Sequence, residues 1–200
     1  SFEFNPAFDS TFSNADNPPL DFETNGSSVI RIGLSYTPKQ LYIQEPKEKI
    51  VLGSRWPTFS LYYNQAVPGL FKSTTDYKFL ELGVSQKVNL GIFGTSEYNI
   101  QIGSFLDTTE LLPMDYRYQR GGDPYFFIPP MFGYQLIDST FPVFQGFFES
   151  HYNHEFKGFL MSKIPGLKQL NIRVSGGGGL LYVPERNFQY SELHTGLSRL

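Results

Sequence analysis

Hydrophobic and polar residues alternate one by one over several stretches of the chain. Within residues 28–36, Ile32 and Leu34 would share one face of a strand, and Arg31 would lie on the other. Because successive side chains of a β-strand point to opposite faces, this alternation predicts strands with one apolar and one polar side. The stretches with this pattern are residues 28–36, 77–89, 96–104 and 169–175, and less regularly 57–66, 143–157 and 188–199. The sequence therefore predicts an all-β protein with about seven strands.

The predicted strands are joined by connections of very different length. Residues 90–95 and 164–166 are predicted as tight turns, whereas residues 37–57 and 105–140 are predicted as long loops that contain several prolines and glycines. Long loops inside a compact domain usually carry a function or are disordered. Residues 1–27, rich in Asn, Asp, Pro and Ser, are expected to form an irregular lead-in.

The apolar sides of such strands can face in two ways. In a soluble antiparallel β-sandwich they form the core, and the polar sides meet water. In a membrane β-barrel they meet lipid, and the polar sides line a lumen. The polar sides here carry Gly, Ser, Asn and Gln with single charges of both signs, and Tyr and Phe gather near the predicted strand ends, which is typical of a barrel. The predicted lumen-facing residues are Arg31, Glu81, Lys87, Glu97, Gln101 and Arg173.

The composition narrows the classes of protein further. Charged residues make up 18% of the chain, below the roughly 25% usual for soluble domains, and aromatic residues reach 17%. The net charge of -3 argues against a nucleic-acid binder, and the absence of Cys excludes disulfides and thiolate metal ligands. No apolar run is long enough for a transmembrane helix. Residues 1–4 lack a signal-peptide pattern, so we expect that a leader has been removed or that the chain is part of a longer protein.

The predicted number of strands indicates a partial barrel. A sheet edge cannot lie open in the hydrocarbon region of a membrane, because its N–H and C=O groups would have no hydrogen-bond partner. Single-chain bacterial barrels have an even number of strands, at least about eight, whereas about seven are predicted here. We therefore expect residues 28–200 to form an antiparallel transmembrane β-barrel segment that belongs to a larger barrel.

Few residue combinations point to catalysis or to a cofactor. His151, His154 and Glu155 have the residue types of a metal site, but residues 151 and 154 of a strand lie on opposite faces. Gly176–Gly179 lacks the Lys-Ser/Thr that ends a phosphate loop. It is predicted as a flexible strand end or as a place where the backbone approaches another chain. We therefore predict no enzymatic activity, no metal and no cofactor.

The most apolar part of the long loop 105–140 is formed by Tyr125, Phe126 and Phe127. If exposed, these residues would contact a protein partner or lipid. The alternative is that they pack over the mouth of the barrel.

Several strand and turn motifs lie between Pro57 and Arg173. They are residues 57–61 (PTFSL), 80–86 (LELGVSQ), 90–95 (LGIFGT), 154–159 (HEFKGF) and 163–170 (KIPGLKQL). These motifs resemble the C-terminal barrel region of a Bacteroidetes outer-membrane family of unassigned function. Members of that family carry an N-terminal carboxypeptidase-regulatory-like domain, and their barrel is similar to the outer-membrane assembly superfamily typified by BamA and TamA.

The resemblance implies a location and a role. It implies a protein of the outer membrane of a Gram-negative bacterium that contacts outer-membrane lipids and other envelope protein subunits. Its role would be transport, export or assembly of envelope components. In BamA-like barrels a long loop with an Arg-Gly tip folds back into the lumen. Arg120 and Gly121 are at the similar place here, with Glu81 or Glu97 as the expected partner of Arg120, although the aromatic residue that normally follows the Arg-Gly pair is absent.

Two other functions stay open at this point. A soluble β-sandwich would bind a ligand or glycan through its loop aromatics and would need no detergent to stay in solution. A hydrolase would use dispersed carboxylates and His154, in which case His154→Ala would abolish activity without unfolding the protein.

Overall fold

The computed structural model describes residues 26–46, 48–121, 128–137, 141–156 and 172–199. The chain is all-β, because within these ranges its long elements are all strands and its helices are short 3-10 turns. The strands are β1 (Val29–Tyr36), β2 (Leu41–Gln44), β3 (Lys49–Gly53), β4 (Thr58–Ala66), β5 (Asp76–Asn89), β6 (Thr95–Glu110), β7 (Arg117–Tyr118), β8 (Pro142–Val143), β9 (Gly146–Phe156), β10 (Ile172–Val183) and β11 (Phe188–Arg199). The 3-10 turns are η1 (Leu70–Lys72), η2 (Gly91–Phe93), η3 (Pro113–Asp115) and η6 (Pro184–Arg186).

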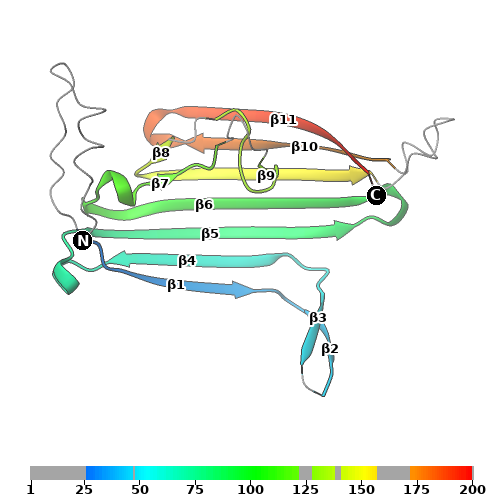
Figure 1. The fold of residues 1–200 in the computed structure, drawn as a ribbon, viewed down its shortest axis with the longest axis horizontal. Coiled ribbons are helices and arrows are strands. Elements are labelled where there is room, and N and C mark those ends of the chain that lie inside the picture. Colours follow the sequence, from blue (N-terminus) through cyan, green and yellow to red (C-terminus); the bar gives the residue numbers. More distant parts are fainter. Residues whose placement is uncertain (1–25, 47, 122–127, 138–140, 157–171, 200) are drawn as a thin grey trace, which may run out of the picture.

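Seven strands form one antiparallel sheet in the order β1-β4-β5-β6-β9-β10-β11 (Figure 1). Each of the seven stretches predicted from alternation overlaps one of these strands, so the all-β prediction is confirmed. The overlap is smallest for residues 169–175, because β10 begins at Ile172 and continues to Val183. Two small sheets, β2–β3 and β7–β8, accompany the main sheet. Among the described residues, β1 and β11 form the two edges of the main sheet and do not pair with each other.

Three local predictions differ from the structure. Residues 37–57 are not a simple loop, because the β-branched and aromatic residues around Tyr42 and Val51 pair as the hairpin β2–β3. The predicted loop 105–140 begins later, because β6 continues to Glu110. Gly176–Gly179 does not end a strand but lies inside β10, paired on both sides with β9 and β11.

The cross-strand register divides the main sheet into two faces. Leu34, Leu61, Leu82, Ile102 and Phe148 lie opposite one another across β1, β4, β5, β6 and β9 and belong to what we name the apolar face. This face is open, since Leu82 is 45% exposed and Ile102 53% exposed. The other face, named here the polar face, carries the residues at the alternate positions, such as Glu81 and Gln101.

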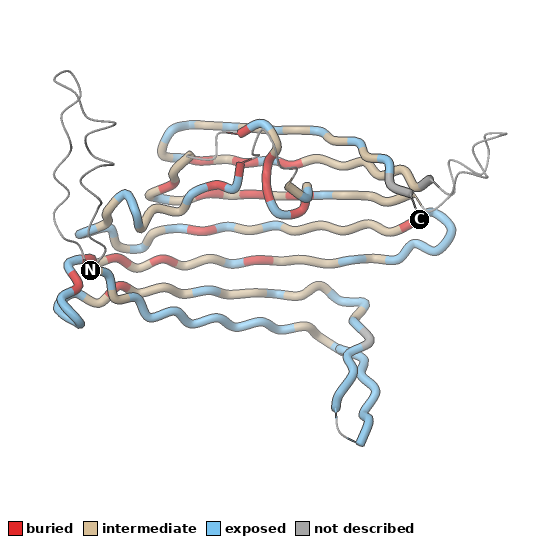
Figure 2. Tube along the Cα trace, viewed as in Figure 1, coloured by how far each residue is buried: buried red, intermediate tan, exposed pale blue. Residues whose placement is uncertain are grey.

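The core lies on the polar face rather than on the apolar face. Residues 111–145 connect β6 to β9, and we name them the covering segment. Its described parts, residues 111–121, 128–137 and 141–145, lie over the polar face. Phe79, Phe147 and Leu181 of the strands form one buried cluster with Tyr134 and Val143 of the covering segment. Figure 2 shows buried stretches both along the strands and in the segment that lies over them. The burial pattern is therefore inverted relative to a soluble sheet, whose apolar face would be the covered one.

Gly179 allows the covering segment to approach β10. A Cβ atom at this position would lie 2.8 Å from Cε1 of the Tyr134 ring, which is closer than side chains tolerate. The Tyr134 ring therefore occupies the space that a side chain at residue 179 would fill. This close approach explains at least one glycine of the Gly176–Gly179 run.

Within the part of the chain that the structure describes, no helix is long and apolar enough to cross a membrane. The predicted lead-in of residues 1–27 and the predicted turn at residues 164–166 fall outside the described residues, except for residues 26 and 27.

Candidate functional site

The polar face carries all six residues predicted to line a lumen. Glu81, Lys87, Glu97 and Gln101 lie on β5 and β6, and register places Arg31 on β1 and Arg173 on β10 on the same face. The alternation of the sequence is sufficient to bring them to one side, because residues that lie opposite each other on neighbouring strands point to the same face of the sheet.

Most charges of the polar face have a partner on a neighbouring strand. Lys87 Nζ lies 3.4 Å from Glu97 Oε2, and Arg173 Nη1 lies 2.8 Å from Glu155 Oε1. Arg31 Nε donates to Asn64 Oδ1 at 3.0 Å. Charged side chains of this face are thus paired across neighbouring strands, beside the hydrophobic cluster that lies on the same face.

The covering segment contributes an arginine to this face, but not the predicted one. Arg117 of β7 lies with its Nη2 3.7 Å from Glu81 Oε2, and its guanidinium stands 5.6 Å from the centre of the Phe147 ring. Arg120 is exposed, and its backbone carbonyl accepts a hydrogen bond from the N–H of Tyr134. Glu97, the other expected partner, pairs with Lys87. The Arg120–Glu81 pairing is therefore replaced by Arg117–Glu81.

Gly121 lies where the covering segment pairs with itself. It is buried and forms a parallel bridge with Tyr134, while the N–H of Gln119 donates to the carbonyl of Phe141. These backbone bonds hold residues 119–121 within the covering segment.

Tyr134 is the central contact between the covering segment and the sheet. Its hydroxyl donates to the carbonyl of Leu180 at 2.8 Å, and its ring lies 4.6 Å from the His151 ring and 5.5 Å from the Tyr190 ring. Burial raises the pKa of the Tyr134 hydroxyl, so the group remains a neutral donor. Sequence reasoning missed this residue, and the only local signal for it was the glycine run that it packs against.

Two carboxylates hold the C-terminal part of the covering segment. Glu192 of β11 accepts from the N–H of Gln135 at 2.9 Å and from the Tyr190 hydroxyl at 2.8 Å. Glu185 of η6 accepts from the consecutive N–H groups of residues 144–146. Hydrogen bonds to a charged acceptor are stronger than neutral ones, so these contacts define the path of the segment.

Among the clefts of the described part of the chain, two on the polar face lie beside residues of the candidate site. The larger, of about 550 Å³, lies over β1, β4 and β5 and is lined by Arg31, Tyr62, Asn64, Tyr77, Glu81 and residues 114–118 among others. The smaller, of about 360 Å³, lies over β6 and β9 and includes Gln101, Gln119, Glu149 and His151. Both combine aromatic rings with hydrogen-bonding groups, which is suited to binding polar molecules.

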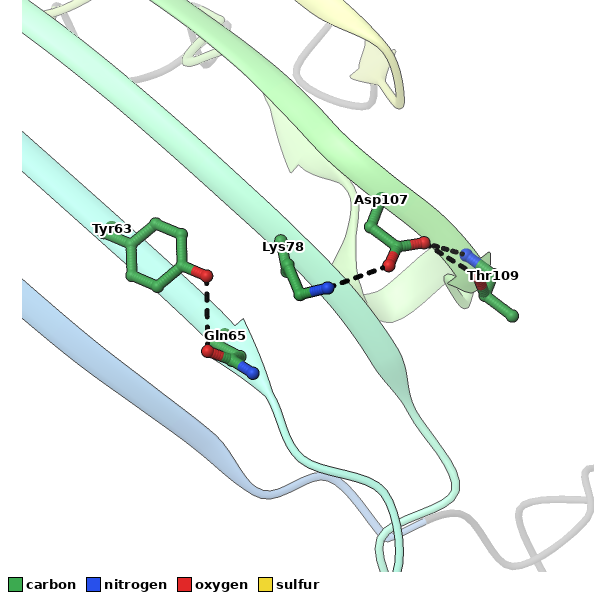
Figure 3. Close-up of polar contacts among 5 residues, drawn as sticks. All are labelled: Tyr63, Gln65, Lys78, Asp107 and Thr109. Atoms are coloured by element: carbon green, nitrogen blue, oxygen red, sulfur yellow. Dashed lines mark hydrogen bonds and ion pairs between the residues drawn. The ribbon is translucent and has the colours of Figure 1, made fainter.

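Polar side chains gather at one end of the apolar face (Figure 3). Lys78 Nζ donates to Asp107 Oδ2 at 3.2 Å, and the other carboxylate oxygen accepts from the hydroxyl and N–H of Thr109. Beside them, the Tyr63 hydroxyl donates to Gln65 Oε1 at 3.2 Å. The apolar face therefore ends in a polar row formed by Gln65, Lys78 and Asp107.

The histidines do not form a metal site. His151 lies on the polar face under Tyr134, whereas His154 lies on the apolar face, where its Nδ1 is 2.8 Å from Ser96 Oγ. The prediction that they lie on opposite faces is confirmed. In the described ranges, no three His, Cys, Asp or Glu residues come together as a metal site. Tyr125, Phe126 and Phe127 lie outside the described residues.

Comparison with known proteins gives one family. Its description is "Family of unknown function (DUF5686) C-terminal domain", and its sequence model matches residues 2–197. No curated protein and no solved structure matches the chain. Because the match spans nearly all of the 200 residues, the chain belongs to the DUF5686 family, as its C-terminal domain.

Proposed function

We propose that the chain is a segment of an outer-membrane β-barrel that acts in transport, export or assembly of envelope components and has no enzymatic activity. The observation that carries this proposal is the open apolar face. Leu34, Leu82 and Ile102 are 62%, 45% and 53% exposed, while the polar face beneath the covering segment is the covered one. Lipid is the solvent that makes such an arrangement favourable.

The dimensions of the apolar face support a membrane-spanning role. One end is the polar row with Lys78. The other end is a second polar row, formed by Ser96 of β6 and His154 of β9, and Ser96 lies opposite Val88 of β5. A rise of about 3.3 Å per residue puts the levels of Lys78 and Val88 about 33 Å apart along β5. A strand tilted by about 40° would then cross about 25 Å, the height of the apolar band of an outer-membrane barrel.

Tyrosines near both polar rows support the same proposal. At one end the Tyr63 hydroxyl donates to Gln65, and at the other the Tyr152 hydroxyl lies 3.3 Å from Ser96 Oγ. Each ring thus lies towards the apolar band with its hydroxyl towards a polar row. Aromatic girdles of membrane barrels have this orientation, because the ring prefers the interface and the hydroxyl prefers water.

The polar face would line the lumen, with the covering segment inside it. Charge pairs such as Lys87–Glu97 and Arg117–Glu81 would then lie where water reaches them. The resemblance of the sequence motifs to a Bacteroidetes outer-membrane family, and of that barrel to the BamA and TamA superfamily, supports export or assembly as the role.

A second candidate function is ligand or glycan binding by a soluble protein. The larger cleft favours it, because aromatic rings such as Tyr62 and Tyr77 stand beside Arg31, Asn64 and Glu81. Fractionation distinguishes the two proposals, since a soluble binder would be recovered without detergent.

The proposed function is tested by changing the charge on each face. Leu82→Arg and Ile100→Arg put a cation on the apolar face, and this should cost about 2–4 kcal/mol at the membrane midplane and block assembly. Lys87→Gln on the polar face should assemble as the unchanged protein does. The measurement is the amount of protein in the detergent-soluble membrane fraction. Equal tolerance of all three substitutions would contradict a lipid-facing apolar side.

A further inference from the structure

The β2–β3 hairpin projects from the main sheet beyond its edge strand β1 (Figure 1). Its two strands pair with each other, from Gln44 opposite Lys49 to Leu41 opposite Gly53. Within the described residues, neither strand packs substantially on any other strand or helix. A two-stranded hairpin is at best marginally stable in water by itself, so we expect a further surface to cover it.

The side chains of the hairpin define which surface fits. Leu41, Ile43 and Ile50 share one side of the hairpin, which we name the hairpin face, and they are 60%, 51% and 40% exposed. The opposite side mixes Tyr42 and Val51 with the polar Gln44 and Lys49. The hairpin is therefore amphipathic, and its apolar side, the hairpin face, is exposed.

Cations stand beside the aromatic rings of this region. Lys49 Nζ lies 3.6 Å from the centre of the Tyr42 ring, and Lys39 Nζ lies 5.4 Å from the centre of the Trp56 ring. Residues 37–57 carry four basic and two acidic residues, although the whole chain has a net charge of -3. Amphipathic rings with flanking lysines prefer the membrane–water interface, and local positive charge favours anionic headgroups.

The base of the hairpin is held near the end of the apolar face. The chain leaves the sheet after Tyr36 and returns at Thr58, which lies opposite Ser85, while β5 continues to Asn89. Gln86, a residue of the apolar face, donates through its Nε2 to the carbonyl of Arg55 at 2.7 Å. The hairpin thus starts close to the polar row of Ser96 and His154, the level at which headgroups would begin.

We propose that the β2–β3 hairpin lies in the headgroup region of the bilayer. The hairpin face contacts the upper acyl chains, and Lys39 and Lys49 contact anionic headgroups. Burial of apolar area and attraction to anionic lipid both contribute to binding of this kind. This inference rests on the proposed membrane function and adds a second, interfacial lipid contact to that of the sheet.

Trp56 is the only Trp of the chain and reports on this contact. The protein is placed in phosphatidylcholine–phosphatidylglycerol vesicles, and its emission is compared with that of Trp56→Phe to isolate the Trp56 signal. We expect lipid brominated near the headgroup end to quench Trp56 several-fold more than lipid brominated near the acyl terminus. We also expect acrylamide in the aqueous phase to quench Trp56 of the vesicle-bound protein several-fold less than Trp56 of the unfolded protein without detergent.

Variants of the hairpin test whether its face makes the contact. Ile43→Ser with Ile50→Ser removes the apolar side and should abolish most of the lipid quenching of Trp56. Gln44→Ser, on the opposite side of the same strand, should leave the quenching unchanged. Vesicles without phosphatidylglycerol should show weaker lipid quenching than vesicles that contain it.

A second probe separates this inference from the proposed function. The chain has no Cys, so a bimane label on Leu82→Cys reports only on the apolar face. Suppose that lipid brominated near the acyl terminus quenches the label at residue 82. If Trp56 is then quenched by acrylamide alone, the hairpin lies in water, and if neither quencher reaches Trp56, a protein partner covers it. Either result overturns the hairpin inference and leaves the membrane function standing. If bromolipid quenches neither probe, the membrane function itself is overturned.

Discussion

At the scale of single residues, a glycine on the polar face decides where the covering segment can approach the sheet. Gly179 leaves the space that the Tyr134 ring fills, whereas Gly176, in the same run, has no comparably close neighbour. The four glycines look alike in the sequence, yet only the structure separates the position that receives a ring from the position that does not.

Gly179→Ala should therefore destabilise the protein more than Gly176→Ala. The added Cβ would meet the Tyr134 ring at 2.8 Å at residue 179, whereas at residue 176 its nearest neighbour would be a backbone oxygen at 3.8 Å. We expect a loss of about 1–3 kcal/mol in the free energy of unfolding for Gly179→Ala and little change for Gly176→Ala. Denaturant titration measures both, and equal effects would contradict the packing of Tyr134 on β10.

Asp115 offers a pH-dependent test in the covering segment. Burial raises the pKa of its carboxyl group, and a hydrogen bond from Ser27 offsets this only in part. Its Oδ2 is buried without a hydrogen-bond partner among the described residues. The raised pKa favours the protonated form in the folded state, so the stability linked to this group is present at low pH and is lost as pH rises through the folded pKa.

Asp115→Asn should therefore stabilise the protein at neutral pH. The gain should shrink as the pH falls towards the ordinary carboxyl pKa of about 3.9, because the wild-type group then becomes neutral as well. Thermal unfolding of both proteins across this pH range measures the difference. Asp107→Asn is the contrasting control, since it removes the partner of Lys78 and should destabilise instead. A gain that is constant with pH would show that ionisation of the Asp115 carboxyl group is not its cause.

At the scale of elements, the alternation of the sequence predicts the strands because each strand carries its own pattern. Residues 188–199 had the least regular pattern and still form β11. The covering segment could not be predicted in the same way, because its contacts join residues far apart in the chain. Arg117 meets Glu81, and Tyr134 meets Leu180, without any local pattern that marks either pair. Hence the faces of the candidate site were predictable, but its cover and the identity of the arginine that pairs with Glu81 were not.

Glu185 should control whether the covering segment stays in place. It accepts from the N–H groups of Phe144, Gln145 and Gly146, where the segment enters β9. Glu185→Gln keeps the shape of the side chain but removes its charge. We expect the free energy that holds the covering segment on the sheet to fall by about 1–3 kcal/mol, because the three donors lose a charged acceptor. The segment should then be cleaved faster by a protease. The measurement is the rate of proteolysis within residues 111–145. Glu48→Gln at the exposed hairpin tip is the control and should not change that rate.

At the scale of the whole molecule, the two edge strands of the sheet limit where the protein can lie, because their outward backbone groups need hydrogen-bond partners. β1 is exposed along its full length, and within the described residues it pairs only with β4. β11 likewise pairs only with β10 there. In water such edges are tolerated, but in hydrocarbon every unpaired N–H and C=O group costs several kcal/mol. A membrane location therefore requires neighbouring strands at both edges.

Hydrogen exchange of the backbone amides in the membrane-embedded protein tests this requirement. In an antiparallel pair, alternate residues of an edge strand point their N–H groups away from the partner, so about half of the amides of β1 face outward. If the barrel is closed by neighbouring strands, these outward amides should exchange as slowly as those of the central strands β5 and β6. Fast exchange at alternate positions of β1 or β11, with slow exchange in β5 and β6, would reveal open edges. Such edges are compatible with water and not with lipid, so this pattern would favour the soluble binding protein over the barrel.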